Sequence, residues 1–445
     1  MSSVFGIDLP QKWSASSLKY LASFLGRGTA PVYADDGEIF AVSQAVNQVE
    51  GLDWTRARFH AFSGNTKRLK GLLQSGDSLI NSTGTGTLGR VGYYAAAPES
   101  RTAMADSHVT VFRADPDELD PRFAYYWLSS APFQQYVYAA LAVGATNQIE
   151  LNREQLGNAP IPVPSLDEQR RIANFLDAET TRLDHLTQAR NDQLDALTER
   201  SFAAVSESLI PGTLTRPLRK YPYPWLPAMP ANTRLTRLGY VCRLQNGVTV
   251  DEGRARTDSD VTRPYLRVAN VQAGHVALDS VTEITVPKYV AKRSTLRAGD
   301  VLMTEGGDLD KLGRGTVWRG ELANCLHQNH VFALRPELDK LDPEYLALMT
   351  QTVHGRCYFE STGTKTTNLA STNSGKILSF PIPLPDLQRQ QELVRQVQKQ
   401  QETVREARQI LTRQSALLAE RRQALITAAV TGRLDVTTAR GVEAP

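Results

Sequence analysis

The most regular pattern of apolar positions lies in residues 381–436. Residues 386–430 contain neither Gly nor Pro, and every seventh residue in the middle is aliphatic: Val397, Val404, Leu411, Leu418 and Leu425. An apolar repeat of seven sustained over four steps is typical of a helix that packs along another helix. The neighbouring d-type positions are polar, at Gln400, Gln414 and Arg421. The pattern therefore predicts a long packed helix with further partners along its flank.

An earlier stretch carries a fainter copy of this pattern. IPVPSLDEQ at residues 161–169 reappears as IPLPDLQRQ at residues 382–390, and three apolar positions downstream, Leu176, Leu183 and Leu197, fall opposite Val397, Val404 and Leu418. The repeat also extends upstream, because SHVTVFRADPDELDPRF (residues 107–123) resembles NHVFALRPELDKLDPEY (residues 329–345). A period near 220 residues indicates two duplicated modules, each followed by one long helix.

Within each module, short apolar runs bounded by turn residues predict β-strands. They lie at residues 38–43, 78–82 and 109–113, and then at 265–271, 281–286 and 331–334. Helices are expected to begin at the two Asp-Pro pairs, over residues 121–130 and 343–353, because Pro suits the first helical turn. The proline-dense residues 210–230 end the first long helix and predict a linker.

The predicted fold class is α+β: two mixed α/β modules in tandem, separated by two long antiparallel coiled-coil helices and related by a pseudo-two-fold axis. Residues 166–209 and 386–430 would each form a helix roughly 66 Å long. The expected bounds are 1–160 for the first module, 161–212 for the first helical region, 213–230 for the linker, 231–380 for the second module, 381–436 for the second helical region and 437–445 for the tail. Two similar heads suit a ligand whose halves are inverted.

Composition adds several exclusions. No apolar run approaches the roughly eighteen residues of a membrane span, and the first residues, MSSVFGIDLPQKW, lack the features of a secretory signal. Three cysteines, Cys242, Cys325 and Cys357, suit a reduced cytoplasmic location and not a disulfide framework. The net charge is only +3, but residues 216–320 hold 17 Lys and Arg against 10 Asp and Glu. This local surplus permits binding to a polyanion.

Gly84, Gly86 and Gly89 spell the dinucleotide fingerprint GxGxxG. A dinucleotide site needs a helix to start at this loop, whereas the following RVGYY predicts a strand. A glycine-rich hairpin that carries Arg90 is therefore the better interpretation, with Arg314 on the counterpart hairpin of the second module.

Cys325, His327 and His330 have spacings that could suit a metal ion, but the first module keeps only His108 of this set. Structural zinc needs four ligands, so ordinary packing is favoured and no metal is expected. The sequence also contains no phosphate-binding loop, no metalloprotease motif, no amino-methyltransferase signature and no nucleophile elbow. No catalytic residue is therefore assigned.

The remaining candidate chemistry is nucleic-acid binding. Arginine reads guanine edges, and both Lys and Arg neutralise phosphates. Candidates in polar, loop-like stretches of the first module are Arg56, Arg58, Lys67, Arg68, Lys70, Thr85, Thr87 and Arg90. Those of the second module are Arg254, Arg256, Arg263, Lys292, Arg293, Lys311 and Arg314. For each residue alone a solvated surface charge is the alternative, so the clusters carry the hypothesis as groups.

The helical stretches resemble a known family. PIPVPSLDEQRRIANFLDAETTRLDHL at residues 160–186 and LAERRQALITAAVTGRLDV at residues 418–436 resemble the conserved helical regions of type I restriction–modification specificity subunits. The order of module, helix, module and helix is also similar, so the resemblance covers essentially the whole chain. Two departures stand out: the second helix starts LQRQQ where Glu-Gln is usual, and the first ends SESLIP where a TGRL exit is expected.

This resemblance implies a non-catalytic, cytoplasmic DNA-reading subunit. The two modules would be target-recognition domains, each reading one half of a split double-stranded DNA target. The helices would set the gap and dock two modification subunits, which bind S-adenosylmethionine and methylate a flipped adenine. Two restriction subunits, using ATP and Mg, could add translocation and cleavage. This chain itself would hold no cofactor and would not contact a membrane.

Two other hypotheses stay open. A coiled-coil scaffold with two protein-binding heads would have the same architecture, and adjacent methyltransferase and helicase-nuclease genes would argue against it. A self-contained restriction enzyme would require catalytic motifs that the sequence does not contain.

Overall fold

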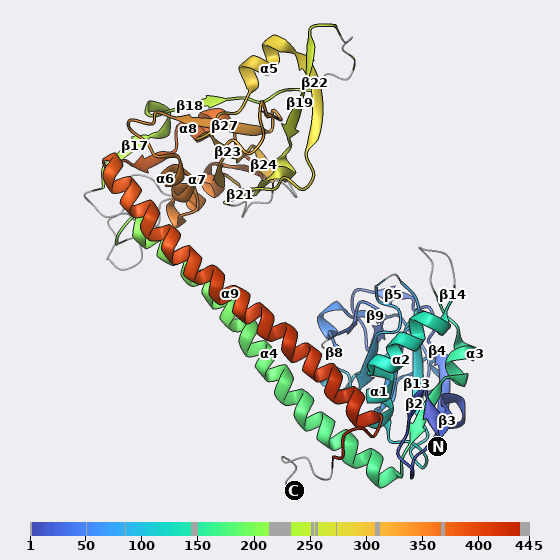
Figure 1. Ribbon diagram of the computed structural model, residues 1–445. Coiled ribbons are helices and arrows are strands. Elements are labelled where there is room, and N and C mark those ends of the chain that lie inside the picture. The colour runs from blue at the N-terminus through green and yellow to red at the C-terminus, as the bar shows by residue number, and fades with distance from the viewer. Residues whose placement is uncertain are drawn as a thin grey trace. The chain divides into compact units, whose positions relative to one another are not determined.

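The computed structural model describes residues 2–49, 51–84, 86–143, 150–212, 233–250, 253, 257–272, 274–307, 312–365 and 370–436. The chain forms two compact units: unit 1 is Met1–Asn191 with Arg413–Pro445, and unit 2 is Asp192–Thr412. Each unit combines a mixed α/β stretch with one segment of each long helix, α4 (Leu166–Leu209) and α9 (Leu387–Val430) (Figure 1). The predicted modules and long helices are confirmed. The predicted domain bounds follow chain order, whereas the units divide both helices, so those bounds stay predictions.

The globular part of unit 1 is built on two four-stranded sheets. The first has the order β11 (Val91–Tyr94), β10 (Asp77–Asn81), β13 (Val109–Ala114) and β4 (Ala22–Arg27), and every pair is antiparallel. The second has the order β12 (Thr102–Ala105), β6 (Ile39–Val42), β9 (Arg58–His60) and β5 (Tyr33–Ala34), in which β12 and β6 run parallel. All five residues of β10 are buried, because this strand lies in the middle of its sheet.

Unit 2 repeats this arrangement. Its antiparallel sheet has the order β18 (Cys242–Gln245), β27 (Val331–Pro336), β23 (Val301–Thr304) and β25 (Gly315–Val317). Its second sheet has the order β22 (Thr282–Pro287), β19 (Asp260–Leu266) and β26 (Leu326–His327), with β19 and β26 parallel. The shared strand order confirms the duplication predicted from the sequence.

Shorter elements complete both units. In unit 1 these are β1 (Ser3–Val4), β2 (Ile7–Asp8), β3 (Ser14–Ser17), η1 (Leu18–Tyr20), β7 (Asn47–Gln48), β8 (Gly51–Leu52), η2 (Trp54–Arg56), η3 (Thr66–Arg68), η4 (Pro98–Ser100), α2 (Ala131–Tyr136), η5 (Val137–Leu141), β14 (Ala142–Val143), β15 (Glu150–Leu151), α3 (Arg153–Asn158) and β16 (Pro160–Val163). In unit 2 they are β17 (Leu235–Arg237), η6 (Leu238–Tyr240), η7 (Val268–Asn270), β20 (Val271–Gln272), β21 (His275–Val276), α5 (Lys288–Ser294), β24 (Gly306–Gly307), α7 (Val353–Thr362), β28 (Thr364–Lys365), β29 (Ala370–Ser371), α8 (Ser374–Leu378) and β30 (Pro381–Pro383).

The Asp-Pro pairs begin helices α1 (Pro121–Ser129) and α6 (Pro343–Thr350), as predicted. The side chains of Asp120 and Asp342 cap them by accepting backbone N–H groups of the first turn. The second prediction ran too far, to residue 353. The helix stops at Thr350 because Thr352 caps the next helix, α7, and its hydroxyl accepts the N–H of Gly355 at 3.1 Å. The strand predicted at 265–271 is also misplaced: β19 ends at Leu266, and η7 follows.

Helices α4 and α9 each contain 44 residues and run antiparallel. In unit 1, Arg422 forms an ion pair with Asp184 at 3.2 Å. In unit 2, Arg408 donates to Thr198, and the Ser208 hydroxyl donates to Gln400 at 3.3 Å. Residue numbers thus rise along α4 as they fall along α9. None of the helices in the described part of the chain is long and apolar enough to cross a membrane.

Burial along the helices follows the aliphatic heptad positions. Leu176, Leu183 and Val397 are buried, whereas Leu197, Val404, Leu411, Leu418 and Leu425 are half-buried. The polar d-type positions predicted at Gln400, Gln414 and Arg421 lie one residue before the positions that face inward. Gln414 and Arg421 are exposed, while the residues that follow them, Ser415 and Arg422, are half-buried. In these two heptads the second inward-facing position follows the aliphatic one by four residues, whereas after Val404 it follows by three, at Ala407.

Each unit is completed by the end of the helix that started in the other unit. Ile426, Ala429 and Val430, at the end of α9, belong to the core of unit 1, and the Thr427 hydroxyl accepts the N–H of Ala131 at 3.3 Å. The end of α4 does the same in unit 2, where the Ser206 hydroxyl accepts the N–H of Val353 at 2.9 Å. The unusual SESLIP ending of the first helix thus keeps a hydroxyl at the position where α9 has Thr427.

Candidate nucleic-acid interface

One buried glutamine fixes each globular stretch on its own long helix. Gln169 is fully buried near the start of α4; its Oε1 accepts the N–H of Asp120 at 2.7 Å, and its Nε2 donates to the carbonyls of Pro164 and Glu118. Gln390 in α9 makes the same three contacts, accepting the N–H of Asp342 at 2.9 Å and donating to the carbonyls of Pro385 and Lys340. The Asp-Pro cap and the long helix are therefore held together by one side chain in each unit.

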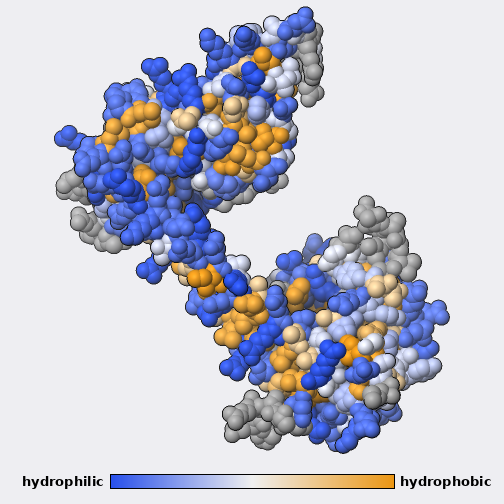
Figure 2. Space-filling view, viewed as in Figure 1, coloured by the Kyte–Doolittle hydropathy of each residue, from blue (hydrophilic) through white to orange (hydrophobic). Residues whose placement is uncertain are grey.

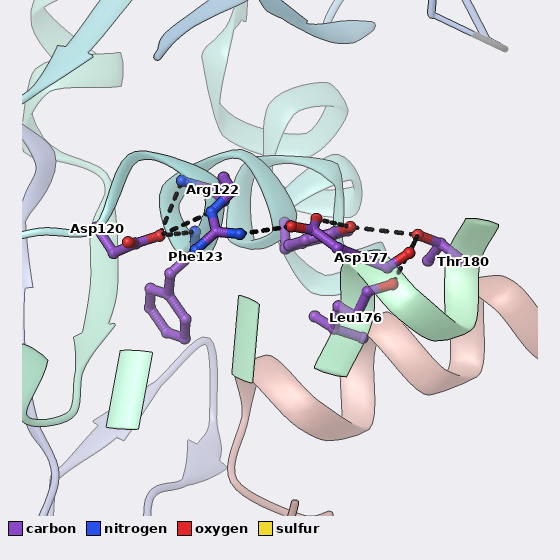
Figure 3. Close-up of polar contacts among 7 residues, drawn as sticks. Asp120, Arg122, Phe123, Leu176, Asp177 and Thr180 are labelled. Atoms are coloured by element: carbon purple, nitrogen blue, oxygen red, sulfur yellow. Dashed lines mark hydrogen bonds and ion pairs between the residues drawn. The ribbon is translucent and has the colours of Figure 1, made fainter. Parts of the chain in front are cut away.

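In unit 1 a polar cluster reinforces this junction, as Figure 3 shows. Asp177 on α4 accepts from Arg122 Nη1 at 2.7 Å and from the Tyr126 hydroxyl at 2.6 Å. The Thr180 hydroxyl donates to the carbonyl of Leu176 at 2.6 Å. Burial, followed by the hydrogen bond to Asp177, raises the pKa of Tyr126 above its ordinary value. The junction orients the two sheets of unit 1 on the helix.

A buried ion pair supports the central sheet of each unit. Arg113 reaches both carboxylate oxygens of Asp77 at 2.7 and 2.8 Å, and Arg335 reaches both oxygens of Asp300 at 2.8 and 2.7 Å. Asp77 and Asp300 are buried, and each also accepts a backbone N–H from its own turn. These arginines serve the fold, and they are not available as a surface for a ligand.

The glycine motif forms the predicted hairpin between β10 and β11, and the counterpart loop joins β23 to β25. Gly89 and Gly313 both adopt positive φ, at +76° and +74°. A Cβ at Gly89 would lie 2.7 Å from Val137 and one at Gly313 would lie 2.2 Å from the Phe359 ring. These glycines therefore permit close packing of the hairpin on a helix or helical turn of the same unit.

Contacts in this loop region involve two further candidates. Arg90 Nη1 donates to the Asn47 carbonyl and to Gln48 Oε1, both at 3.1 Å, and Thr87 donates to Gln44 at 2.9 Å. Arg90 thus braces the loop that contains Gln44 and Gln48. Thr85 lies outside the described residues.

The other cations of unit 1 differ in their surroundings. Arg56 pairs with Asp53 at 2.8 Å, and hydrogen bonds from Thr55 and then Arg56 hold the pKa of Asp53 below its ordinary value. The Arg58 guanidinium lies over the Tyr33 ring, 4.1 Å from its centroid. Tyr33 donates to Asp106 at 2.6 Å, and burial, with this hydrogen bond, raises its pKa to about 12.

Arg68 and Lys70 are exposed and line a cavity of about 480 Å³. Arg27 and Arg113 also line it, but Arg27 pairs with Glu150 and Arg113 with Asp77, so Arg68 and Lys70 are the candidate cations there. The side chain of Lys67 lies outside the described part of the chain.

In unit 2, Lys292 and Arg293 are exposed on α5, and Arg263 on β19 is half-buried. Arg314 is half-buried beside the glycine hairpin. The positions of Arg254, Arg256 and Lys311 fall outside the described residues. Which of the candidate side chains contacts DNA stays a prediction.

The Cys-His motif is spread over separate packing sites. Cys325 is buried and donates to the Leu326 carbonyl, His327 contacts the Val331 carbonyl at 2.6 Å, and His330 lies 2.5 Å from Glu305. Burial raises the pKa of Cys325 to about 12 and lowers the pKa of His327. Among the residues that the structure describes, no three His, Cys, Asp or Glu side chains gather as metal ligands.

Several polar or aromatic residues at these surfaces were missed by the sequence analysis, which searched for cations. They are Tyr33, Gln44, Gln48 and Tyr289. Tyr289 is 76% exposed on α5. The adjacent basic residues in KYVAKRS were the available signal.

Part of the sequence matches a known protein family. Residues 12–196 match the family described as "Type I restriction modification DNA specificity domain". Over this stretch the chain is similar to type I restriction–modification specificity subunits. It is 28% identical over 280 residues to the EcoKI specificity subunit of Escherichia coli strain K12, a match covering 62% of this chain and 58% of that protein. It is 24% identical over 285 residues to the StySPI specificity subunit of Salmonella potsdam, covering 63% and 58%. These matches span about three fifths of each relative.

Solved structures share the fold of this chain. A chain from a type I R-M system, solved in work on complex assembly and conformational transition, aligns with a TM-score of 0.70 at 20% identity, covering 96% of this chain and all of that one. The HsdS subunit of Thermoanaerobacter tengcongensis aligns with a TM-score of 0.50 at 18% identity, covering 96% and 98%. These likenesses confirm the predicted class of mixed α/β domains with coiled-coil helices.

Proposed function

We propose that this chain is the DNA-reading subunit of a type I restriction–modification complex, in which each unit reads one half of a bipartite double-stranded target. The observation that carries the proposal is the duplicated recognition fold, held on a long helix by an equivalent glutamine in each copy. A fixed junction suits sequence reading, because base contacts require a defined register on the duplex. The pseudo-two-fold relation of the two halves and the cytoplasmic location are parts of the same proposal.

The long helices would set the gap between half-sites and dock two modification subunits. Apolar side chains on their outer surface support this role: Leu186, Ile410 and Leu417 are 42%, 57% and 53% exposed. Figure 2 shows hydrophobic residues at the surface of the long helices. In unit 2 the helices also form a groove of about 430 Å³ lined by Leu197, Val205 and Val404. Exposed apolar surface of this kind is typical of a protein-binding site.

The chemistry would belong to the partners. A modification subunit would supply S-adenosylmethionine and the adenine-methylating site, and a restriction subunit would supply ATP and Mg for translocation and cleavage. The proposal assigns no catalytic residue, cofactor or metal to this chain.

The deciding experiment is co-expression of the chain with a type I methyltransferase subunit in a host without other modification systems, followed by single-molecule methylome sequencing. We expect adenine methylation at one split motif with a fixed gap, and none when this chain is omitted. An unchanged methylome, with the methyltransferase demonstrably active beside another specificity subunit, would reject the proposal and favour the protein scaffold.

A further inference from the structure

One short segment occupies the same place in both units. In unit 1 it is η3 with Leu69 and Lys70, between β9 and β10, and in unit 2 it is α5, between β22 and β23. The strands that precede the two segments, β9 and β22, are equivalent. In unit 1, β9 pairs antiparallel with β6, which runs parallel to β12. In unit 2, β22 pairs antiparallel with β19, which runs parallel to β26. The following strands, β10 and β23, are also equivalent in the antiparallel sheets.

The same neighbour anchors both segments. Leu69 is 7% exposed and packs in a small cluster with Met104 of β12, and Ala291 is 5% exposed in a cluster with Leu326 of β26. Met104 and Leu326 are themselves equivalent in the duplication, because the adjacent backbone contacts match: Leu73 N–H donates to Ala103 O and Leu296 N–H donates to Cys325 O, both at 2.9 Å. One side of each segment is thus buried on the parallel strand pair, and the other faces outward.

The outward sides share charge but little sequence. Residues 54–76 contain five Lys and Arg and no Asp or Glu, and residues 284–299 contain four and again none. The whole chain is nearly balanced, with 50 Lys and Arg against 47 Asp and Glu. Acid-free basic stretches at equivalent positions are therefore a shared property of the two copies, although TKRLKG and KYVAKRS have little else in common.

These side chains are available to a ligand. Lys288, Tyr289, Lys292 and Arg293 are all exposed on α5, and within the described part of the chain none of these side chains has an ion-pair or hydrogen-bond partner. In unit 1, Arg68 and Lys70 are likewise exposed at the cavity described above. Figure 1 shows α5 at the opposite end of unit 2 from α6 and α8.

We infer that η3 with Lys70 in unit 1, and α5 in unit 2, are backbone clamps: each holds sugar–phosphate beside the half-site of its own unit without reading bases. The inference rests on the proposed function and names which part of the DNA these elements contact. Phosphate contacts need a cation within reach and carry no sequence information. The two copies can therefore diverge in residues and local conformation while retaining charge, as they have done. The exposed Tyr289 hydroxyl adds a neutral donor to the clamp of unit 2.

The test is the salt dependence of DNA binding by the full chain in complex with its modification subunits. The variant K288Q/K292Q/R293Q should reduce the slope of log affinity against log salt by about 2 to 3, since each phosphate contact contributes about 0.9. The reduction should be the same on a duplex with the target and on a scrambled duplex, and the methylated motif should be unchanged. R68Q/K70Q in unit 1 should reduce the slope by about 2.

Two matched variants control for net charge and for folding. R319Q/K340Q/K376Q removes three charges elsewhere on unit 2, where Arg319 and Lys340 already pair with Glu344 and Glu337, and should leave the slope unchanged. K288R/K292R/R293K retains the charge of α5 and should keep the wild-type slope.

A wild-type slope in K288Q/K292Q/R293Q would overturn the inference. So would a changed base preference, which would make α5 a base reader, or loss of the modification subunits at an unchanged slope, which would make it a protein-binding surface. Failure of the wild-type complex to prefer any target would instead reject the proposed function.

Discussion

Replacing Gln169 with Ala should loosen unit 1 at its junction with α4 and leave unit 2 intact. The side chain is fully buried and makes three hydrogen bonds, to the Asp120 N–H and to the carbonyls of Pro164 and Glu118. Alanine removes all three and leaves buried backbone groups without partners. At about 1 kcal/mol for each of the three bonds, the loss should be at least about 3 kcal/mol, because the orphaned groups add a desolvation cost. This is a large share of the roughly 5–15 kcal/mol that stabilises a domain.

Hydrogen exchange measured by mass spectrometry can localise this loss. Peptides that cover α1 should exchange about 10²-fold faster in Q169A, because each 1.4 kcal/mol is a factor of about ten, while peptides that cover α6 should not change. The duplication supplies a reciprocal control, since Q390A should accelerate α6 and spare α1. Asn174, exposed on the same helix, gives a neutral control as N174A. Equal acceleration of α1 and α6 in Q169A, or no acceleration of either, would refute the assignment of the glutamine as a local junction.

Three further predictions address spacing, pH and the chain end. Deleting residues 405–411 shortens α9 by about 10 Å. Methylome sequencing should then find that the gap between the two half-sites of the methylated motif is changed or abolished, while the half-site sequences are unaltered. New half-site bases at the original gap would contradict the spacing role. Burial lowers the pKa of His354 to about 4. As the pH falls, His354 is therefore protonated in the unfolded chain before it is protonated in the folded one, and the free energy of unfolding of unit 2 should fall by about 2 kcal/mol between pH 7 and pH 5. Urea unfolding of H354Q should lack this contribution, and an equally steep dependence of its stability on pH would refute the prediction. Gly432 has φ +70°, and a Cβ there would lie 2.3 Å from Pro10. G432A should therefore destabilise unit 1 by more than the roughly 1–2 kcal/mol of backbone strain. Gly274 has φ +77° with nothing near its Cβ position, so thermal unfolding of G274A should show the backbone strain alone in unit 2.

Local signals made much of the fold predictable. Asp120 and Asp342 begin helices because an Asp side chain caps the two or three amides that follow it, and proline fits the first turn. Helix α4 occupies the predicted residues 166–209, and α9 begins one residue later than predicted. The errors lie where distant contacts decide: Thr352 ends α6 by capping a second helix, and the polar row of α9 is set by the helix it faces.

The candidate interface was less predictable because a cation has several possible partners. Arg113 and Arg90 look alike in the sequence, yet one is bound to a buried carboxylate and the other braces a loop through a backbone carbonyl. Neither Asp77 nor Asn47 is a neighbour in the chain, so only the folded sheet reveals these pairings. Tyr33 and Tyr289 were missed because an aromatic residue is normally predicted to be buried in the core, and the sequence does not reveal that these two are exposed.

The exchange of helix ends has a consequence for synthesis on the ribosome. Unit 1 begins at the N-terminus, but its core includes Ile426 and Val430 from the end of α9. The Ala131 N–H donates to the hydroxyl of Thr427, which lies 296 residues further along the chain. At about 5–20 residues per second, roughly 15–60 s separate the emergence of these two groups. Unit 2 has all of its residues once Thr412 is made. The first unit to be translated is therefore the last to be completed, and its exposed apolar surface must be protected from aggregation until the final helix arrives.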